Sequence, residues 1–229
     1  LLYSVCQTCK WAHRVLESTV RRQRQMCSRD RFSADPKQSH AEALGYIGRY
    51  LKGSKDKGIL LDPKHEKSFE CWVDADFLGQ YEKGAKDLHL DKMTAKSRTG
   101  FLITYAGCPV IWGSKLQRES ALSTTESEYL SLSESFRSLL PLMDLLEEAR
   151  EMGVPIESGL PMVHCKAFED NSGALELARL PKMGPRTKHI KVKYHHFREA
   201  VAKGRVSIQH VASKDQLGDA LTKNLPRDL

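Results

Sequence analysis

Four acidic residues stand where the expected strands end or the expected helices begin. Asp74 lies in VDADF (73–77), Glu128 in STTESEY (123–129), Asp170 in EDNSGA (169–174) and Asp219 in KDQLGDALTK (214–223). A polar residue at one such position is usually a turn or cap residue, so each acid alone is weak evidence of function. Strand ends and helix starts are also where open α/β sheets gather their ligands. The four acids together therefore form a candidate site.

Carboxylates that converge from separate elements can bind hard divalent cations. Mg²⁺ prefers oxygen ligands and keeps several of its waters. Two such ions about 4 Å apart stabilise both the attacking and the leaving oxygen of a phosphodiester. The set predicts phosphodiester chemistry with two Mg²⁺ ions, or Mn²⁺ in their place, bound by Asp74, Glu128, Asp170 and Asp219.

Two glutamates compete for the ligand role in the helix expected after residue 123. Glu128 shares a helix face with Leu132 and lies beside Tyr129, and both of these residues should face the sheet. Glu126 follows Ser123 at the spacing of a capping box. We expect Glu128 in the site and Glu126 in the helix cap.

The elements that must position these acids alternate between strand and helix patterns. Apolar β-rich runs predict strands over 69–77, 98–106, 109–115, 162–168 and 205–211. Helical spacing predicts helices over 36–52, 124–140, 171–179, 188–203 and 215–223, with Pro141 ending or kinking the long helix before a further helix to about 152. This order predicts an α/β fold with a mixed five-stranded sheet flanked by helices.

The 229 residues carry a formal net charge of +7, which is unevenly distributed. Residues 1–40 hold +5, residues 41–178 hold −6 and residues 179–205 hold +8. Basic stretches beside an acidic body suit a nucleic-acid partner, and a solvated basic surface is the alternative. No apolar run is long enough for a membrane span, and no secretory signal pattern precedes the acidic body. Six scattered cysteines make no disulfide framework, which favours a reducing compartment.

Other chemistries fit the sequence poorly. Cys6 and Cys9, with His13 and Cys27 nearby, lack the second close ligand pair of most structural zinc sites. No serine lies in a Gly-x-Ser-x-Gly elbow, and there is no Gly-rich phosphate loop. These absences leave the carboxylate set as the best-supported chemistry.

Further motifs accompany the four acidic ones in a single order along the chain. They begin with FSADPKQSH (32–40) and include GRYLKG (48–53), SRTGF (97–101), VIWGSKLQ (110–117) and PRTKHIKVKYHHFRE (185–199). The series resembles the C-terminal ribonuclease H domain of copia-type retrotransposon Pol polyproteins, together with the end of the reverse transcriptase. No single motif would carry this resemblance, whereas the ordered series does.

The resemblance implies a ribonuclease H-like fold and a two-metal endonuclease that hydrolyses the RNA strand of RNA/DNA hybrids during reverse transcription. It places the family's metal ligands on the same four acids, Asp74, Glu128, Asp170 and Asp219. It also implies an RNA/DNA hybrid and the reverse transcriptase portion of the parent polyprotein as partners, and no membrane. Four basic residues become candidate phosphate contacts, with a solvated helix face as the alternative: Lys188, Lys191, Lys193 and Arg198.

The resemblance also divides the chain. It implies an unmatched basic segment at 1–31, the end of the reverse transcriptase and its connection at 32–65, and a ribonuclease H-like domain at 66–229. Three positions depart from the family pattern: Phe77 replaces Trp, Glu169 replaces a common Cys, and Gly218 replaces a frequent Ala. The glycine should weaken the last helix by about 1 kcal/mol.

A second hypothesis stays open at this point, namely a catalytically inactive nucleic-acid-binding remnant of a retrotransposon Pol. All four acids are present, which favours the active nuclease. For an active copy we expect a cytoplasmic location in a virus-like particle, or a nuclear one, and no secretion.

Overall fold

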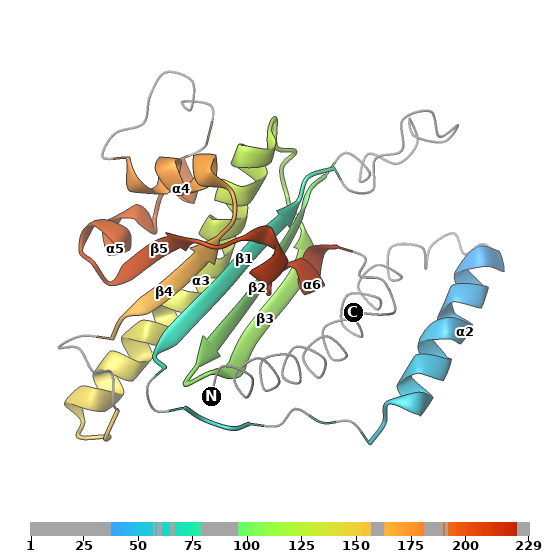
Figure 1. Cartoon of the computed structure of the whole chain (residues 1–229), viewed down its shortest axis with the longest axis horizontal. Coiled ribbons are helices and arrows are strands. Elements are labelled where there is room, and N and C mark those ends of the chain that lie inside the picture. The colour runs from blue at the N-terminus through green and yellow to red at the C-terminus, as the bar shows by residue number, and fades with distance from the viewer. Residues whose placement is uncertain are drawn as a thin grey trace. The chain divides into compact units, whose positions relative to one another are not determined.

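The computed structural model describes residues 38–56, 58, 61–64, 67–78, 96–156, 163–180, 190 and 192–223 (Figure 1). The chain forms two compact units, Leu1–Leu61 and Asp62–Leu229. In the first unit, α2 spans Gln38–Gly53, close to the helix expected over 36–52. The segment 1–31, with its cysteines and arginines, lies outside the described residues, and the domain boundaries drawn from the sequence stay a prediction.

The second unit is built on a mixed five-stranded sheet in the order β3-β2-β1-β4-β5. Its strands are β1 (Phe69–Asp76), β2 (Arg98–Tyr105), β3 (Cys108–Leu116), β4 (Cys165–Glu169) and β5 (Val206–His210). β1, β2 and β3 pair antiparallel, while β4 pairs parallel to both β1 and β5. The predicted fold class, an α/β fold with a mixed five-stranded sheet flanked by helices, is therefore confirmed.

One continuous helix, α3, spans Thr124–Glu151 and includes Pro141. Of the two predicted effects of Pro141, an end of the helix is excluded, and a kink stays a prediction. Leu139 and Met143 flank Pro141 in sequence and are both fully buried, so packing on either side holds the helix together despite the missing hydrogen bond. Among the described residues, none of the helices combines the length and the apolar character that crossing a bilayer requires.

The segment before β5 differs from its predicted form. A helix was expected over 188–203, but its described part contains a 3-10 turn, η3 (Val192–Tyr194), and a short helix, α5 (Arg198–Ala202). Ile190, Tyr194 and Phe197 are buried all the same. The apolar spacing therefore identified which side chains face the core, although the backbone reaches them without one continuous helix.

The remaining elements are short and surround the ends of the strands. α4 spans Ser172–Arg179, as expected. The helix expected over 215–223 is divided into a 3-10 turn, η4 (Ser213–Asp215), and α6 (Asp219–Thr222). Gly218 lies at the N-cap of α6, where glycine is tolerated, so the predicted propensity cost does not apply.

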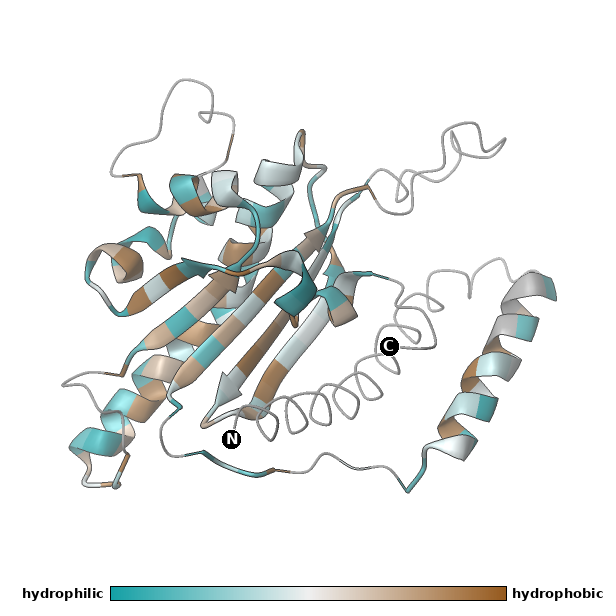
Figure 2. Ribbon diagram, viewed as in Figure 1, coloured by the Kyte–Doolittle hydropathy of each residue, from teal (hydrophilic) through white to brown (hydrophobic). Residues whose placement is uncertain are grey.

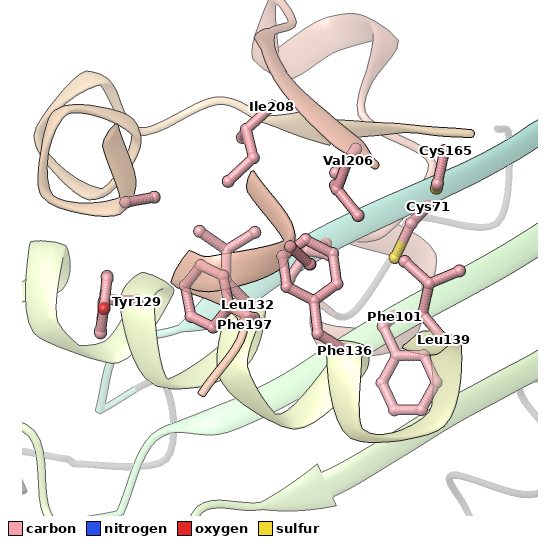
Figure 3. Packing of buried hydrophobic residues seen from close by; sticks show 14 of the residues in the cluster. Cys71, Phe101, Tyr129, Leu132, Phe136, Leu139, Cys165, Phe197, Val206 and Ile208 are labelled. Carbon is pink, nitrogen blue, oxygen red and sulfur yellow. The ribbon is translucent and has the colours of Figure 1, made fainter. Parts of the chain in front are cut away.

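The core lies between α3 and one face of the sheet. Tyr129 and Leu132, which were expected to face the sheet, are fully buried with Phe136 and Leu139, and Figure 3 shows the four side chains facing residues of the strands. Hydrophobic and polar residues alternate along the strands in Figure 2, so each strand has a core face and an opposite face. α6 packs on β1 and β2 (Figure 1). The candidate site lies at the carboxyl ends of β1 and β4.

Candidate active site

Asp74 lies near the end of β1 and is only 1% exposed. The Thr222 hydroxyl donates to its Oδ2, and the Lys223 ammonium lies 3.4 Å from its Oδ1. Burial raises the pKa of Asp74 to about 7, although the Thr222 hydrogen bond and the Lys223 charge act in the opposite direction. The carboxyl group is therefore held inside the protein by α6 and by the residue that follows it.

The approach of α6 to the sheet depends on two glycines. A Cβ atom at Gly218 would lie 3.0 Å from both the Cβ and the backbone N of Asp74. A Cβ atom at Gly100, the β2 partner of Asp74, would lie 2.5 Å from Cγ2 of Thr222. Since neither glycine has a Cβ, α6 can pack directly over Asp74.

Asp219 is the first residue of α6 and accepts a hydrogen bond of 2.6 Å from Lys223. The segment before it is tied to the sheet, because Gln216 Nε2 donates to the Val73 carbonyl over 2.8 Å. Gln216 Oε1 in turn accepts from the Gly218 N–H at 3.0 Å. One buried amide therefore fixes both the strand and the turn that carry Asp74 and Asp219.

Asp170 follows β4 directly and lies where α4 begins. Its Oδ2 accepts a hydrogen bond of 2.7 Å from Ser213 in η4. Asn171 caps α4 by accepting from the Ala174 N–H at 3.0 Å. The tight connection between β4 and α4 thus leaves the Asp170 carboxylate at the edge of the sheet, beside η4.

Glu128 reaches the site from α3 and is 6% exposed. Its Oε2 has no hydrogen-bond partner among the described residues. Burial and the neighbouring Glu169 charge raise the pKa of Glu128 to about 11. Glu126 serves the helix end instead: its N–H donates to Ser123 Oγ at 3.1 Å, and its Oε2 accepts from the Leu122 N–H at 2.8 Å. The two glutamates have the distinct surroundings expected from helix geometry.

The structure brings all four predicted acids together, in two overlapping groups. Carboxylate oxygens of Asp74, Asp170 and Asp219 lie within 4.8 Å of one another, and so do oxygens of Glu128, Glu169 and Asp170. Asp170 belongs to both groups and links the α6 side of the site to the α3 side. Their assignment as metal ligands stays a prediction, and the geometry required for it is present.

The donor set fits hard divalent cations. It consists of carboxylate oxygens, the ligands that Mg²⁺ and Mn²⁺ prefer, and Glu128 contributes a buried oxygen without a partner. Asp74, Asp170 and Asp219 could hold one ion, and Glu128 with Asp170 could hold the second. The Lys223 ammonium bonds Asp74 and Asp219.

Sequence reasoning missed two members of this constellation. Glu169 was noted only as a departure from the family pattern, although the alternation of Cys165, Ala167 and Glu169 along β4 places it on the buried face. Lys223 stands four residues after Asp219, a spacing that brings two side chains together on a helix. These spacings indicate the buried face for Glu169 and a neighbour for Lys223, but the part each residue plays in the site depends on the assembled fold.

Two of the four candidate phosphate contacts lie in the described part of the chain. Lys193 is exposed and forms an ion pair of 2.8 Å with Glu119, and Arg198 is the first residue of α5. Lys193 also lines a surface pocket with Lys115, Arg118 and Arg137. Lys188 and Lys191 lie outside the described residues. The pocket is also lined by Glu134, which pairs with Lys115 and Arg137, so these cations are partly neutralised.

The comparisons with known proteins give relatives but no family model, since none matches the chain. The chain is 33% identical over 196 residues to the retrovirus-related Pol polyprotein from transposon RE1 of Arabidopsis thaliana, with 86% of this chain matched. It is 31% identical over 198 residues to the one from transposon TNT 1-94 of Nicotiana tabacum, with 86% matched. The chain spans about 12% to 13% of the length of these relatives.

A solved structure of a ribonuclease H1 isolated from compost is similar at 13% identity. The match has a TM-score of 0.44 and covers 68% of this chain and 93% of that one.

Proposed function

We propose that this chain, whose homologues are Pol polyproteins of copia-type transposons, is a ribonuclease H that hydrolyses the RNA strand of RNA/DNA hybrids. Its fold is the ribonuclease H-like one implied by the motif series, with a mixed sheet in the order β3-β2-β1-β4-β5. The single observation that carries the activity is the convergence of four carboxylates from β1, α3, the end of β4 and α6.

Two divalent cations, when bound, would supply a water nucleophile of lowered pKa and stabilise the attacking and leaving oxygens of the phosphodiester. Asp170 would bind both ions, a role supported by its membership of both oxygen groups. Asp74 and Asp219 complete one side, and Glu128 completes the other. Gln216 and Thr222 hold the carboxylates in position, so the geometry exists before an ion arrives.

The basic surface supports a nucleic-acid substrate. The pocket lined by Lys115, Arg118, Arg137 and Lys193 opens beside Thr99 and Gln117 of the β2–β3 side of the sheet. Phosphate contacts of this kind fix the position of a duplex without reading its sequence. Residues 179–205, which include Lys193 and Arg198, carry a charge of +8 and add to the attraction.

The test is cleavage of a labelled RNA strand paired with DNA, in the presence of Mg²⁺. We expect Asp74→Asn and Asp170→Asn each to reduce cleavage by more than about a hundredfold, beyond the 10- to 100-fold loss that is typical for removing the partner of a metal ligand. Asp62→Asn is the matched control, because Asp62 is exposed and is not part of either oxygen group.

Three outcomes would contradict the proposal. Equal cleavage by the wild type and both site variants would remove these residues from the reaction. Hybrid binding without cleavage at any Mg²⁺ or Mn²⁺ concentration would favour the inactive remnant. Cleavage of duplex DNA in place of the hybrid would point to a different nuclease.

A further inference from the structure

Glu169 is a fully buried carboxyl group on the core face of β4. Its Oε1 accepts a hydrogen bond of 3.1 Å from the Asn171 N–H. Its Oε2 has no partner among the described residues. A buried polar oxygen without a partner destabilises a protein, so this atom requires an explanation.

Glu128 faces Glu169 from α3 and shows the same feature. The Glu128 Oε2 is also buried and lacks a partner in the described part of the chain. One carboxylate oxygen from each glutamate and one from Asp170 lie within 4.8 Å of one another. Three carboxyl groups therefore converge on one place, and two of them carry a buried oxygen without a partner among the described residues.

Among the described residues, neither Glu169 nor Glu128 forms an ion pair, and the ion pairs of Lys223 are with Asp74 and Asp219. The Lys223 charge lowers the pKa of Glu128, but burial and the neighbouring carboxylates outweigh it. Adjacent buried carboxyl groups cannot all stay ionised unless a cation lies between them. A small divalent cation would provide positive charge and partners for both free oxygens at once.

We propose that Glu169 is a further ligand of the divalent cation held by Glu128 and Asp170. The inference rests on the proposed function, because it concerns an ion of the same site. It assigns three carboxylates to the α3 side, which makes that side more negative than Glu128 and Asp170 alone would. The expected consequence is tighter binding of the second ion.

The test counts bound Mn²⁺ by the electron paramagnetic resonance signal of the free ion, without substrate. Glu169→Gln keeps the size of the side chain and removes its charge. We expect the dissociation constant of the weaker Mn²⁺ to rise at least about tenfold, a loss typical for disturbing a metal site. Glu169→Asp keeps the charge and should bind with intermediate affinity.

Folding is checked in the same samples. The midpoint of thermal unfolding without metal should be unchanged or higher in Glu169→Gln, because a buried acid with an unpartnered oxygen is replaced by a neutral amide of the same size. The rise in that midpoint on adding Mn²⁺ should be smaller than in the wild type. Glu176→Gln is the matched control, since Glu176 is exposed on α4.

Unchanged or tighter Mn²⁺ binding by Glu169→Gln would overturn the inference and assign the buried acid a purely structural role. A wild type that binds no Mn²⁺ would overturn it as well. A wild type that binds two ions, loses one in Glu169→Gln and yet cleaves no hybrid would support the ligand and refute the nuclease. Binding and cleavage therefore test the two proposals separately.

Discussion

Lys223 places a positive charge beside two of the clustered carboxylates, those of Asp74 and Asp219. Its ammonium lies 2.6 Å from Asp219 Oδ1 and 3.4 Å from Asp74 Oδ1. Partial burial works against the charged form, but the Asp219 hydrogen bond and the Asp74 charge raise the pKa of Lys223 above its usual value. In the metal-free protein the lysine therefore offsets part of the repulsion between these acids, and a metal ion must compete with it.

Replacing the lysine should separate these two effects. We expect Lys223→Met to bind Mg²⁺ about fivefold more tightly, since a competing charge is removed. The metal-free variant should lose less than about 1 kcal/mol of unfolding free energy, because the lysine side chain is 41% exposed and solvent screens its pairs. Calorimetric titration with Mg²⁺ and urea denaturation measure the two quantities.

Lys203→Met provides the control, because Lys203 pairs with Glu199 at the same four-residue spacing away from the acids. It should leave Mg²⁺ affinity unchanged. Weaker Mg²⁺ binding by Lys223→Met would show that the lysine supports the bound ion instead of competing with it.

Among the secondary-structure elements, α3 contains Pro141 in its interior and is nevertheless continuous, because its buried side chains pack in the core. Pro141 is exposed, and the residues that hold this part of the helix, Leu139 and Met143, point into the core. The proline lacks the N–H that would bond to the preceding turn, so the helix carries an internal weakness.

Pro141→Ala should therefore raise the free energy of unfolding by about 1–3 kcal/mol. Urea denaturation followed by circular dichroism measures the change. Pro155→Ala is the comparison, since Pro155 is exposed and follows the helix, and it should give no such gain. A loss of stability in Pro141→Ala would mean that α3 depends on a bend at this position for its contacts with the sheet.

The presence of each helix and strand was easier to predict from the sequence than the residues at which it begins and ends. All five strands, α2 and α4 lie within a few residues of their predicted places, because strand alternation and caps are local signals. The break between η3 and α5 and the division before α6 arise from tertiary contacts. Gln216, for example, leaves the helical path to bond a strand residue 143 positions earlier.

At the scale of the whole molecule, the site joins acids from distant parts of the sequence. Strand ends and helix starts were sufficient to select Asp74, Glu128, Asp170 and Asp219, because in an α/β sheet these places converge. Glu169 and Lys223 were not selected. Their roles depend on which neighbours remain unpartnered, and that is a property of the assembled site.

The concentration of buried acids makes the metal-free protein sensitive to pH. Burial raises the pKa of Asp74 to about 7, whereas an unfolded aspartate titrates near 4. Between these values the folded state holds more protons than the unfolded state, so stability falls as the pH rises. Three histidines act in the opposite direction, because burial lowers the pKa of His164, His195 and His196.

A comparison of the wild type with Asp74→Asn isolates the contribution of the aspartate. The free energy of unfolding of the metal-free variant minus that of the wild type should rise by about 2 kcal/mol from pH 5 to pH 7.5. Urea denaturation at both pH values measures this difference, and the histidines contribute equally to both proteins. An identical difference at the two pH values would mean that Asp74 titrates as it does in the unfolded chain.

Added Mg²⁺ provides a second test of how Asp74 affects the stability of the folded protein. At pH 7.5 it should stabilise the wild type and have a much smaller effect on Asp74→Asn, since binding to the folded state alone raises stability. Equal stabilisation of both proteins would place the ion elsewhere.

The helix that supplies Asp219 is only four residues long, too short to form by itself in water. It forms by docking on a strand that is synthesised much earlier. On the ribosome, the first three acids emerge and can begin to fold while this segment is still unmade or inside the exit tunnel. The four-acid cluster is therefore completed only when α6 docks, and it stays open while the other three acids are already held by the sheet and by α3.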